Sequence, residues 1–177
     1  MSTNPRRHPI TVDEYYRLAP TGRVELIEGD IIDMSPIGSM HADMVDDLNE
    51  LLRAAVGSLA RVRTQNPLRL GLHNEPQPDL AVVKPGRYRL AHPTSADAFL
   101  VVEVADTTLR DDLDVKVPLY ARHAIPEVWV LDVNQNALHV FCGLCEGKYT
   151  DTDVVMAPSA RDLTSLPVRV DLSALWR

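Results

Sequence analysis

Long hydrophobic runs are missing from this sequence. No stretch approaches the roughly 20 apolar residues that a membrane-spanning helix needs. Residues 1–7 are polar and basic and lack the apolar segment of a signal peptide. A cytoplasmic location, away from membranes, is therefore expected. Glycine-rich G-x-G-x-x-G and phosphate-loop motifs are also missing, so a nucleotide-binding function has no support.

Cysteine is scarce, with only Cys142 and Cys145 in a C-x-x-C arrangement. Such a motif can be a redox pair or half of a zinc site. There is no second Cys pair and no nearby His pair at zinc-ligand spacing. The surrounding pattern predicts strand and turn, whereas a thioredoxin-like motif joins a strand to a helix. Two reduced thiols beside a hairpin are expected, and a redox protein is the alternative.

Positive charge is also in deficit, with 18 Lys and Arg against 25 Asp and Glu, a net charge of −7. This balance argues against a protein that coats nucleic acid. It is compatible with an enzyme that cuts nucleic acid, because clustered carboxylates hold a metal ion that restores positive charge. A local basic strip is still expected. The candidates are Arg61, Arg63 and Arg69, and Lys84, Arg87 and Arg89.

The 177 residues fit one domain, 1–177, with a core of its own. A capping-box pattern at Thr11 predicts a short helix over 12–18. Apolar residues at helical spacing predict a long helix capped by Ser39, and a third helix is expected at about 112–123. The apolar face of the long helix contains Met44, Leu48, Leu51, Leu52, Ala55 and Leu59. His41, at its start, is interpreted as a capping or surface residue.

Strand patterns alternate with these helices. Residues 23–34 are typical of a hairpin that turns at Gly29-Asp30. The run 98–105 is apolar enough to be a central strand covered on both faces, and 79–84 is a shorter apolar strand. A second hairpin is expected from 127–133 and 137–141. The fold class is therefore α/β or α+β, a mixed sheet flanked by helices.

Glu103 stands inside the apolar strand 98–105, where an ionised carboxylate is costly unless it is paired or holds a metal ion. If strands 79–84 and 98–105 pair as antiparallel neighbours, Asp79 comes to lie beside Glu103. Two adjacent carboxylates repel each other unless a cation lies between them. Mg²⁺ suits such a pair, because it takes one or two carboxylates and accepts phosphate oxygens.

A purely structural alternative remains. Glu103 could pair with an Arg or Lys, while Asp79 caps a turn after Pro78. Lys116, 13 residues after Glu103 on the predicted third helix, can reach back to stabilise developing charge. A single helix lysine is otherwise an ordinary surface residue.

Ordered short motifs run along the chain from about residue 23 to residue 133. They are Glu25-Leu26-Ile27 with Gly29, Met34-Ser35-Pro36 with His41, Pro78-Asp79, Val102-Glu103-Val104, Asp112 with Lys116 and Tyr120, and Pro126-Glu127-Val128-Trp129 with Asp132. In this order and spacing the sequence resembles the Uma-two family of restriction-endonuclease-like proteins. That family is a branch of the PD-(D/E)XK nuclease superfamily.

The resemblance implies a restriction-endonuclease-like fold and a Mg²⁺- or Mn²⁺-dependent nuclease acting on DNA. Asp79, Glu103 and the Val104 carbonyl would be metal ligands. Lys116 would be catalytic and Glu25 would assist, although Glu25 also fits an exposed strand residue. A homodimer is expected by analogy with nucleases that cut two strands.

The superfamily pattern has a lysine two residues after the glutamate, where this chain has Ala105, and the resemblance implies that the lysine has moved to the downstream helix as Lys116. The sequence departs from the family in two places. After Glu103 it has Ala105-Asp106-Thr107-Thr108, where the family has a turn that contains serine and proline. Pro118 falls inside the predicted third helix and requires that helix to start late or to bend. These departures leave a second hypothesis open, a nuclease fold retained as a non-cleaving binding module.

Overall fold

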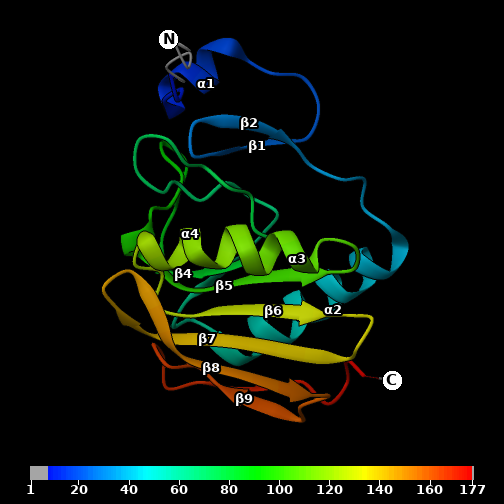
Figure 1. Cartoon of the computed structure of the whole chain (residues 1–177). Coiled ribbons are helices and arrows are strands. Elements are labelled where there is room, and N and C mark those ends of the chain that lie inside the picture. Colours follow the sequence, from blue (N-terminus) through cyan, green and yellow to red (C-terminus); the bar gives the residue numbers. More distant parts are fainter. Residues whose placement is uncertain (1–7, 177) are drawn as a thin grey trace.

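A computed structural model describes residues 8–176 of the chain (Figure 1). Its centre is a six-stranded sheet in the order β3-β4-β5-β6-β7-β8. The strands are β3 (Arg61–Thr64), β4 (Leu80–Val83), β5 (Ala98–Ala105), β6 (Val128–Asp132), β7 (Ala137–Cys145) and β8 (Lys148–Met156). Only β5 and β6 pair in parallel, so this is the mixed α+β sheet that was predicted. Within the described residues, no helix is long and apolar enough to cross a membrane.

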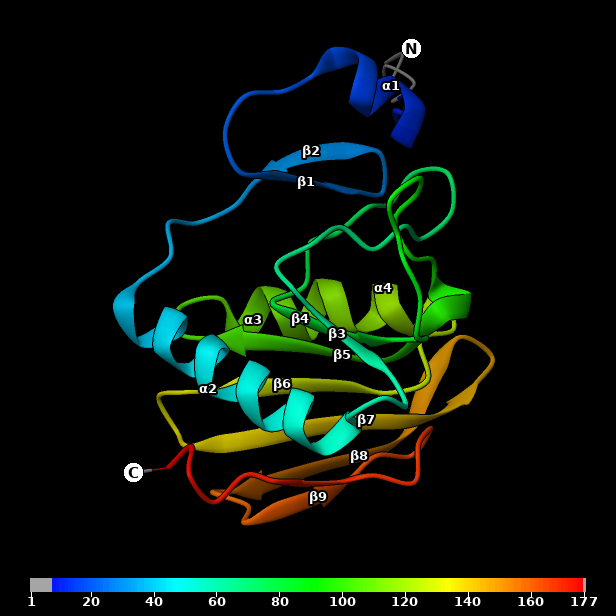
Figure 2. The same ribbon diagram turned by 180° about the vertical axis from the view of Figure 1, so that it is seen from behind.

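Helices cover both faces of the sheet because the apolar residues of β5 alternate between them. Leu100, Val102 and Val104 belong to the core beneath α2 (Ser39–Val56), which lies in front of the sheet in Figure 2. Val101 and Ala105 belong to the opposite core. That face is covered by α3 (Leu109–Asp111), the π-helix η2 (Asp112–Lys116) and α4 (Val117–Arg122). The predicted central strand is therefore confirmed.

A small cap lies above the sheet in Figures 1 and 2. It consists of α1 (Val12–Leu18), β1 (Val24–Ile27) and β2 (Asp30–Asp33). The capping box of Thr11 and Glu14 is formed as predicted. The turn is one residue earlier than expected, at Glu28-Gly29, because Ile27 pairs with Asp30. Both turn residues have positive φ, which matches the twist of a tight hairpin.

Two helix boundaries differ from the predictions. Gly38 is the N-cap of α2 and Ser39 is its first residue, so the predicted serine cap is wrong. The third helix begins at Leu109, before the expected residue 112, and passes through η2. Pro118 lies in the first turn of α4, where its missing N–H is tolerated. The wider π-helical turn before it accommodates the proline, so the helix is irregular and does not start late.

The second hairpin is formed by β6 and β7, as predicted, and β7 continues to Cys145 to pair with β8. Cys142 and Cys145 are free thiols on this extended strand, in the arrangement expected for reduced cysteines. A short 3₁₀ helix, η1 (Ser95–Asp97), precedes β5. Two short strands, β9 (Ala160–Asp162) and β10 (Arg169–Asp171), form a separate ribbon. Leu172 and Leu175 after it are buried in the core beneath α2.

Candidate active site

The antiparallel pairing of β4 with β5 brings the two predicted acids together. Leu80 lies opposite Val102, so the preceding Asp79 reaches the level of Glu103. The Val104 backbone N–H donates to Oδ2 of Asp79 at 2.9 Å, which ties that carboxylate to β5. Both side chains are buried, with exposed fractions of 8% for Asp79 and 2% for Glu103. The convergence predicted from the sequence is present at this end of the sheet.

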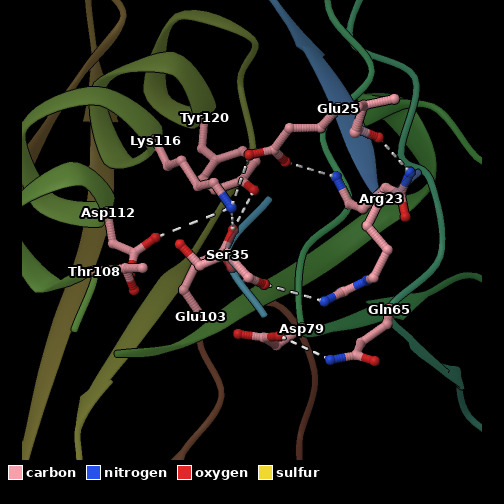
Figure 3. Close-up of polar contacts among 12 residues, drawn as sticks. Arg23, Glu25, Ser35, Gln65, Asp79, Glu103, Thr108, Asp112, Lys116 and Tyr120 are labelled. Atoms are coloured by element: carbon pink, nitrogen blue, oxygen red, sulfur yellow. Dashed lines mark hydrogen bonds and ion pairs between the residues drawn. The ribbon is translucent and has the colours of Figure 1, made fainter. Parts of the chain in front are cut away.

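Lys116 lies at the centre of the cluster (Figure 3). Its Nζ is 3.4 Å from Oε1 of Glu103 and 3.4 Å from Oε1 of Glu25. It is also 4.0 Å from Oδ1 of Asp112, one helical turn earlier in η2. Lys116 therefore belongs to this buried cluster, and its interpretation as an ordinary surface residue is wrong. The alternative in which Glu103 pairs with a lysine is also realised, with Lys116 as that partner.

Glu25 reaches the site from β1 of the cap. It is buried, so its interpretation as an exposed strand residue is wrong. The Gln77 backbone N–H donates to its Oε2 at 3.1 Å, fixing the carboxylate against the segment that leads to Asp79. Tyr120 of α4 donates its hydroxyl to Oε1 of Glu103 at 2.5 Å. The cap, the sheet and α4 each contribute to one buried polar cluster.

Three further residues of the cluster were not assigned to it from the sequence. His41, in the first turn of α2, places Nε2 2.9 Å from Oδ1 of Asp79, which overturns its capping or surface interpretation. Gln65 Nε2 donates to the same oxygen at 3.3 Å. Asp112 is buried beneath Lys116 and accepts from the Thr108 hydroxyl at 2.7 Å. Its i, i+4 spacing to Lys116 was the available signal.

The cluster holds more negative than positive charge, and its pKa values reflect this. Burial raises the pKa of Glu103 well above its usual value. Lys116 opposes this, while Asp112, Asp79 and Glu25 add to it. Burial likewise raises the pKa of Asp112. Lys116 has a raised pKa, because the surrounding carboxylates outweigh the opposing effect of burial. Lys116 therefore stays protonated, and its ammonium group offsets part of the cost of ionising the buried Glu103 carboxyl.

A cavity of about 390 Å³ opens onto the cluster between the cap and the sheet. Glu25, Asp79, Glu103, Asp112, His41 and Lys116 are all among its lining residues. Arg23 lines it too, and its Nη1 donates to the Ser35 carbonyl at 3.4 Å. None of the six residues of the two predicted basic strips lines this cavity. The strips, if they bind phosphates, do so outside it.

The donor set is suited to a hard divalent cation. Four buried carboxylates face one lysine and one histidine, so an added cation would reduce their mutual repulsion. In the described part of the chain, no three His, Cys, Asp or Glu side chains are grouped as a ready metal site. Mg²⁺ binds through one or two carboxylates plus waters and therefore needs no such group. Asp79 and Glu103 are the pair that could hold it.

Comparison with known proteins places this arrangement in context. None of the curated proteins compared with the chain matches it. A solved structure, that of a putative nuclease belonging to DUF820 from Anabaena variabilis ATCC 29413, superimposes with a TM-score of 0.74 at 18% sequence identity. The match covers 95% of this chain and 98% of that one, which establishes a shared fold. The Uma2 family model, described as "Putative restriction endonuclease", matches residues 12–174, and the chain therefore belongs to the Uma2 family.

Proposed function

We propose that this protein is a Mg²⁺- or Mn²⁺-dependent endonuclease that hydrolyses phosphodiester bonds in DNA. The observation that carries the proposal is a cluster of four buried carboxylates that lines a cavity, three of them within 4.0 Å of the Lys116 ammonium group. Burying this excess of negative charge lowers the stability of the folded state when no cation is bound. The cost is understandable if a cation completes the site. Membership of a nuclease-like family supports the same activity.

Each residue has a distinct role in this proposal. Asp79 and Glu103 would hold the metal ion, with the Val104 carbonyl as a third ligand. A bound metal ion would supply an activated water and polarise the phosphate. Lys116 stays protonated and can orient the attacking water or stabilise charge on the phosphate oxygens. Glu25 of β1 assists by contacting the Lys116 ammonium group.

The test is cleavage of supercoiled and linear DNA by the purified protein with Mg²⁺ or Mn²⁺. We expect metal-dependent cleavage that EDTA stops and that falls at least about 100-fold in Asp79→Ala, because the metal and its activated water are lost. Asp47→Ala is the matched control, since Asp47 is exposed on α2 and does not line the cavity. Intact DNA under all metal conditions would rule the proposal out.

A second candidate is a non-cleaving module that binds nucleic acid or protein. It is favoured by one observation, the Lys116 ammonium group that already neutralises Glu103 and Glu25. Thermal unfolding during Mn²⁺ titration separates the two candidates. Ligand that binds only the native state must raise Tm, by an amount that grows with its concentration. A rise in wild type that is lost in Asp79→Ala supports the metal-dependent enzyme. An unchanged Tm supports the module.

A further inference from the structure

One edge of the six-stranded sheet gathers positive side chains away from the cavity. We call this group the β3-edge basic patch. It consists of Arg61, Arg63, Lys84, Arg87 and Arg89. The two segments that supply it, 61–63 and 84–89, contain no acidic residue, in a chain with 25 acids and 18 bases.

Specific contacts hold the two segments together. Arg61 on the edge strand β3 donates Nη1 to the Gly86 carbonyl at 2.8 Å. The guanidinium carbon of Arg63 is 5.4 Å from the centre of the Tyr88 ring, a cation–π arrangement. The Tyr88 hydroxyl donates to the Lys84 carbonyl at 2.9 Å. These contacts make the patch a defined surface, although its two segments are separated by 20 residues of sequence.

The patch lacks the carboxylate partners that five of the eight other described arginines have. Elsewhere in the structure arginines form ion pairs, namely Arg69–Asp13, Arg110–Asp114, Arg122–Glu28, Arg161–Asp153 and Arg169–Asp162. Across residues 8–176 no ion pair joins a patch member to a carboxylate. The nearby Asp97 instead accepts hydrogen bonds from Thr94. Burial and then the neighbouring Arg61 lower the pKa of Arg63, so an anion bound here would relieve repulsion.

Strand β3 links the patch to the candidate active site. Val62 is buried beneath α2, so Arg61 and Arg63 project on the opposite face of the sheet. The register places Arg63 level with Val101, whose side of β5 also carries Glu103. Gln65, just after β3, contacts Asp79. Arg61 and Gln65 are four residues apart, at most about 13 Å along an extended chain. A bound polyanion can therefore run from the patch toward the cavity.

We propose that the β3-edge basic patch binds the phosphate backbone of DNA outside the cavity and aligns the strand whose next phosphates enter it. The identity of the partner rests on the proposed function. The cavity itself offers little positive charge to bind the DNA backbone on either side of the cleaved bond. Lys116 already contacts carboxylates, and Arg23 is the other permanent cation among the lining residues. The patch supplies the missing positive surface. Tyr88 among the cations adds an aromatic ring of the kind found in nucleic-acid grooves.

The test is equilibrium binding of a fluorescent DNA duplex in EDTA, which prevents cleavage, over a range of salt concentrations. We compare wild type with Arg87→Gln/Arg89→Gln and with Arg17→Gln/Lys148→Gln. The two double variants change net charge equally, and all four positions are exposed. Each phosphate contact contributes about 0.9 to the slope of log affinity against log salt. We expect the patch variant to lose about 2 from the slope and about tenfold in affinity near 0.1 M salt. The control variant should match wild type.

Equal losses in both double variants would overturn the inference, because net charge alone would then account for binding. Absence of duplex binding by wild type at low salt would also overturn it. The outcome is separable from that of the proposed function. Salt-dependent binding through the patch without any cleavage would retain the patch and reject the nuclease. Cleavage with identical salt slopes in all three proteins would retain the nuclease and reject the patch.

Discussion

Among single residues, Lys116 supplies the positive charge that compensates the buried carboxylates of the cluster. Its ammonium group contacts Glu103 and Glu25 at 3.4 Å, and both carboxylates are buried. Lys116→Met would leave these charges uncompensated. Breaking a buried ion pair by removing one partner costs about 3–5 kcal/mol. We expect a loss of about 3 kcal/mol at neutral pH, measured by urea unfolding.

The pH dependence of that loss follows from the charge states. The pKa of Lys116 is raised above 10.5, so its contribution is complete at neutral pH and is lost only as the pH rises through that raised value. At acidic pH the carboxylates of the variant take up protons, so the cost of Lys116→Met should shrink. Lys148→Met, at an exposed position of β8, is the control and should change stability by less than about 0.5 kcal/mol. Equal stability of wild type and Lys116→Met would refute this role.

His123 is a second residue with a pH-dependent role. Burial, and then the neighbouring Arg122, lower its pKa below 6.5. Its Nε2 lies 3.3 Å from the Asn74 amide nitrogen, an arrangement that suits a neutral ring accepting a hydrogen bond. The unfolded chain therefore takes up the proton first as the pH falls through about 6.5, and the folded state loses stability there.

His123→Gln removes this titration while keeping a hydrogen-bonding side chain. Between pH 7.5 and 5.5, values that bracket the roughly 6.5 of an unfolded histidine, the variant should lose less free energy of unfolding than wild type. Urea unfolding at several pH values measures the difference. His8→Gln is a suitable comparison, because His8 is exposed. Identical pH profiles of wild type and His123→Gln would show that the ring is not held neutral.

At the scale of elements, the β1–β2 hairpin positions Glu25 over the sheet, and Gly29 forms its turn. Gly29 has φ +79°, and a Cβ there would lie 2.3 Å from Cβ of Pro9 and 2.9 Å from the backbone nitrogen of Ile10. Gly22 has φ +92° with nothing within 4 Å of such a Cβ. The two glycines share the same backbone restriction and differ in available space.

Alanine at each position separates these effects. Gly22→Ala should cost about 1 kcal/mol for the left-handed conformation alone. Gly29→Ala should cost at least about 3 kcal/mol, because backbone strain is joined by overpacking against Pro9. It should also weaken metal-dependent activity, since β1 carries Glu25. Denaturant unfolding and cleavage rates measure both effects. Equal costs for the two substitutions would show that the cap can move away from Pro9 freely.

The pairing of strands β4 and β5 is the part of the candidate site that could be predicted from the sequence. Asp79 and Glu103 could be placed together because neighbouring antiparallel strands joined by one loop have few alternative registers. His41 could not be placed, because its approach depends on the path of residues 34–38 between the cap and α2. Asp112 was missed because its i, i+4 spacing to Lys116 does not by itself show whether the pair faces the interior or the solvent.

At the scale of the whole molecule, the sheet separates two cores, and the candidate site lies at one end between them. The core beneath α2 is completed by the C-terminal segment, far from α2 in sequence. Periodicity could not predict this contact, because the segment has no regular helix and its strands have only three residues each. Its Leu172 and Leu175 are buried in this core, and Trp176 packs against it.

Leu172→Ala tests whether this tail stabilises the fold independently of the site. Leu172 is fully buried in the core beneath α2, so the truncation should cost about 3 kcal/mol through lost burial and a residual cavity. It does not line the cavity that holds the acids, so the cleavage rate of the folded variant should equal that of wild type. Leu90→Ala is the control, since Leu90 is fully exposed and should change stability by less than about 0.5 kcal/mol. Cleavage that falls with Leu172→Ala while the protein remains folded would instead mean that the core beneath α2 holds His41 and Asp79 in register.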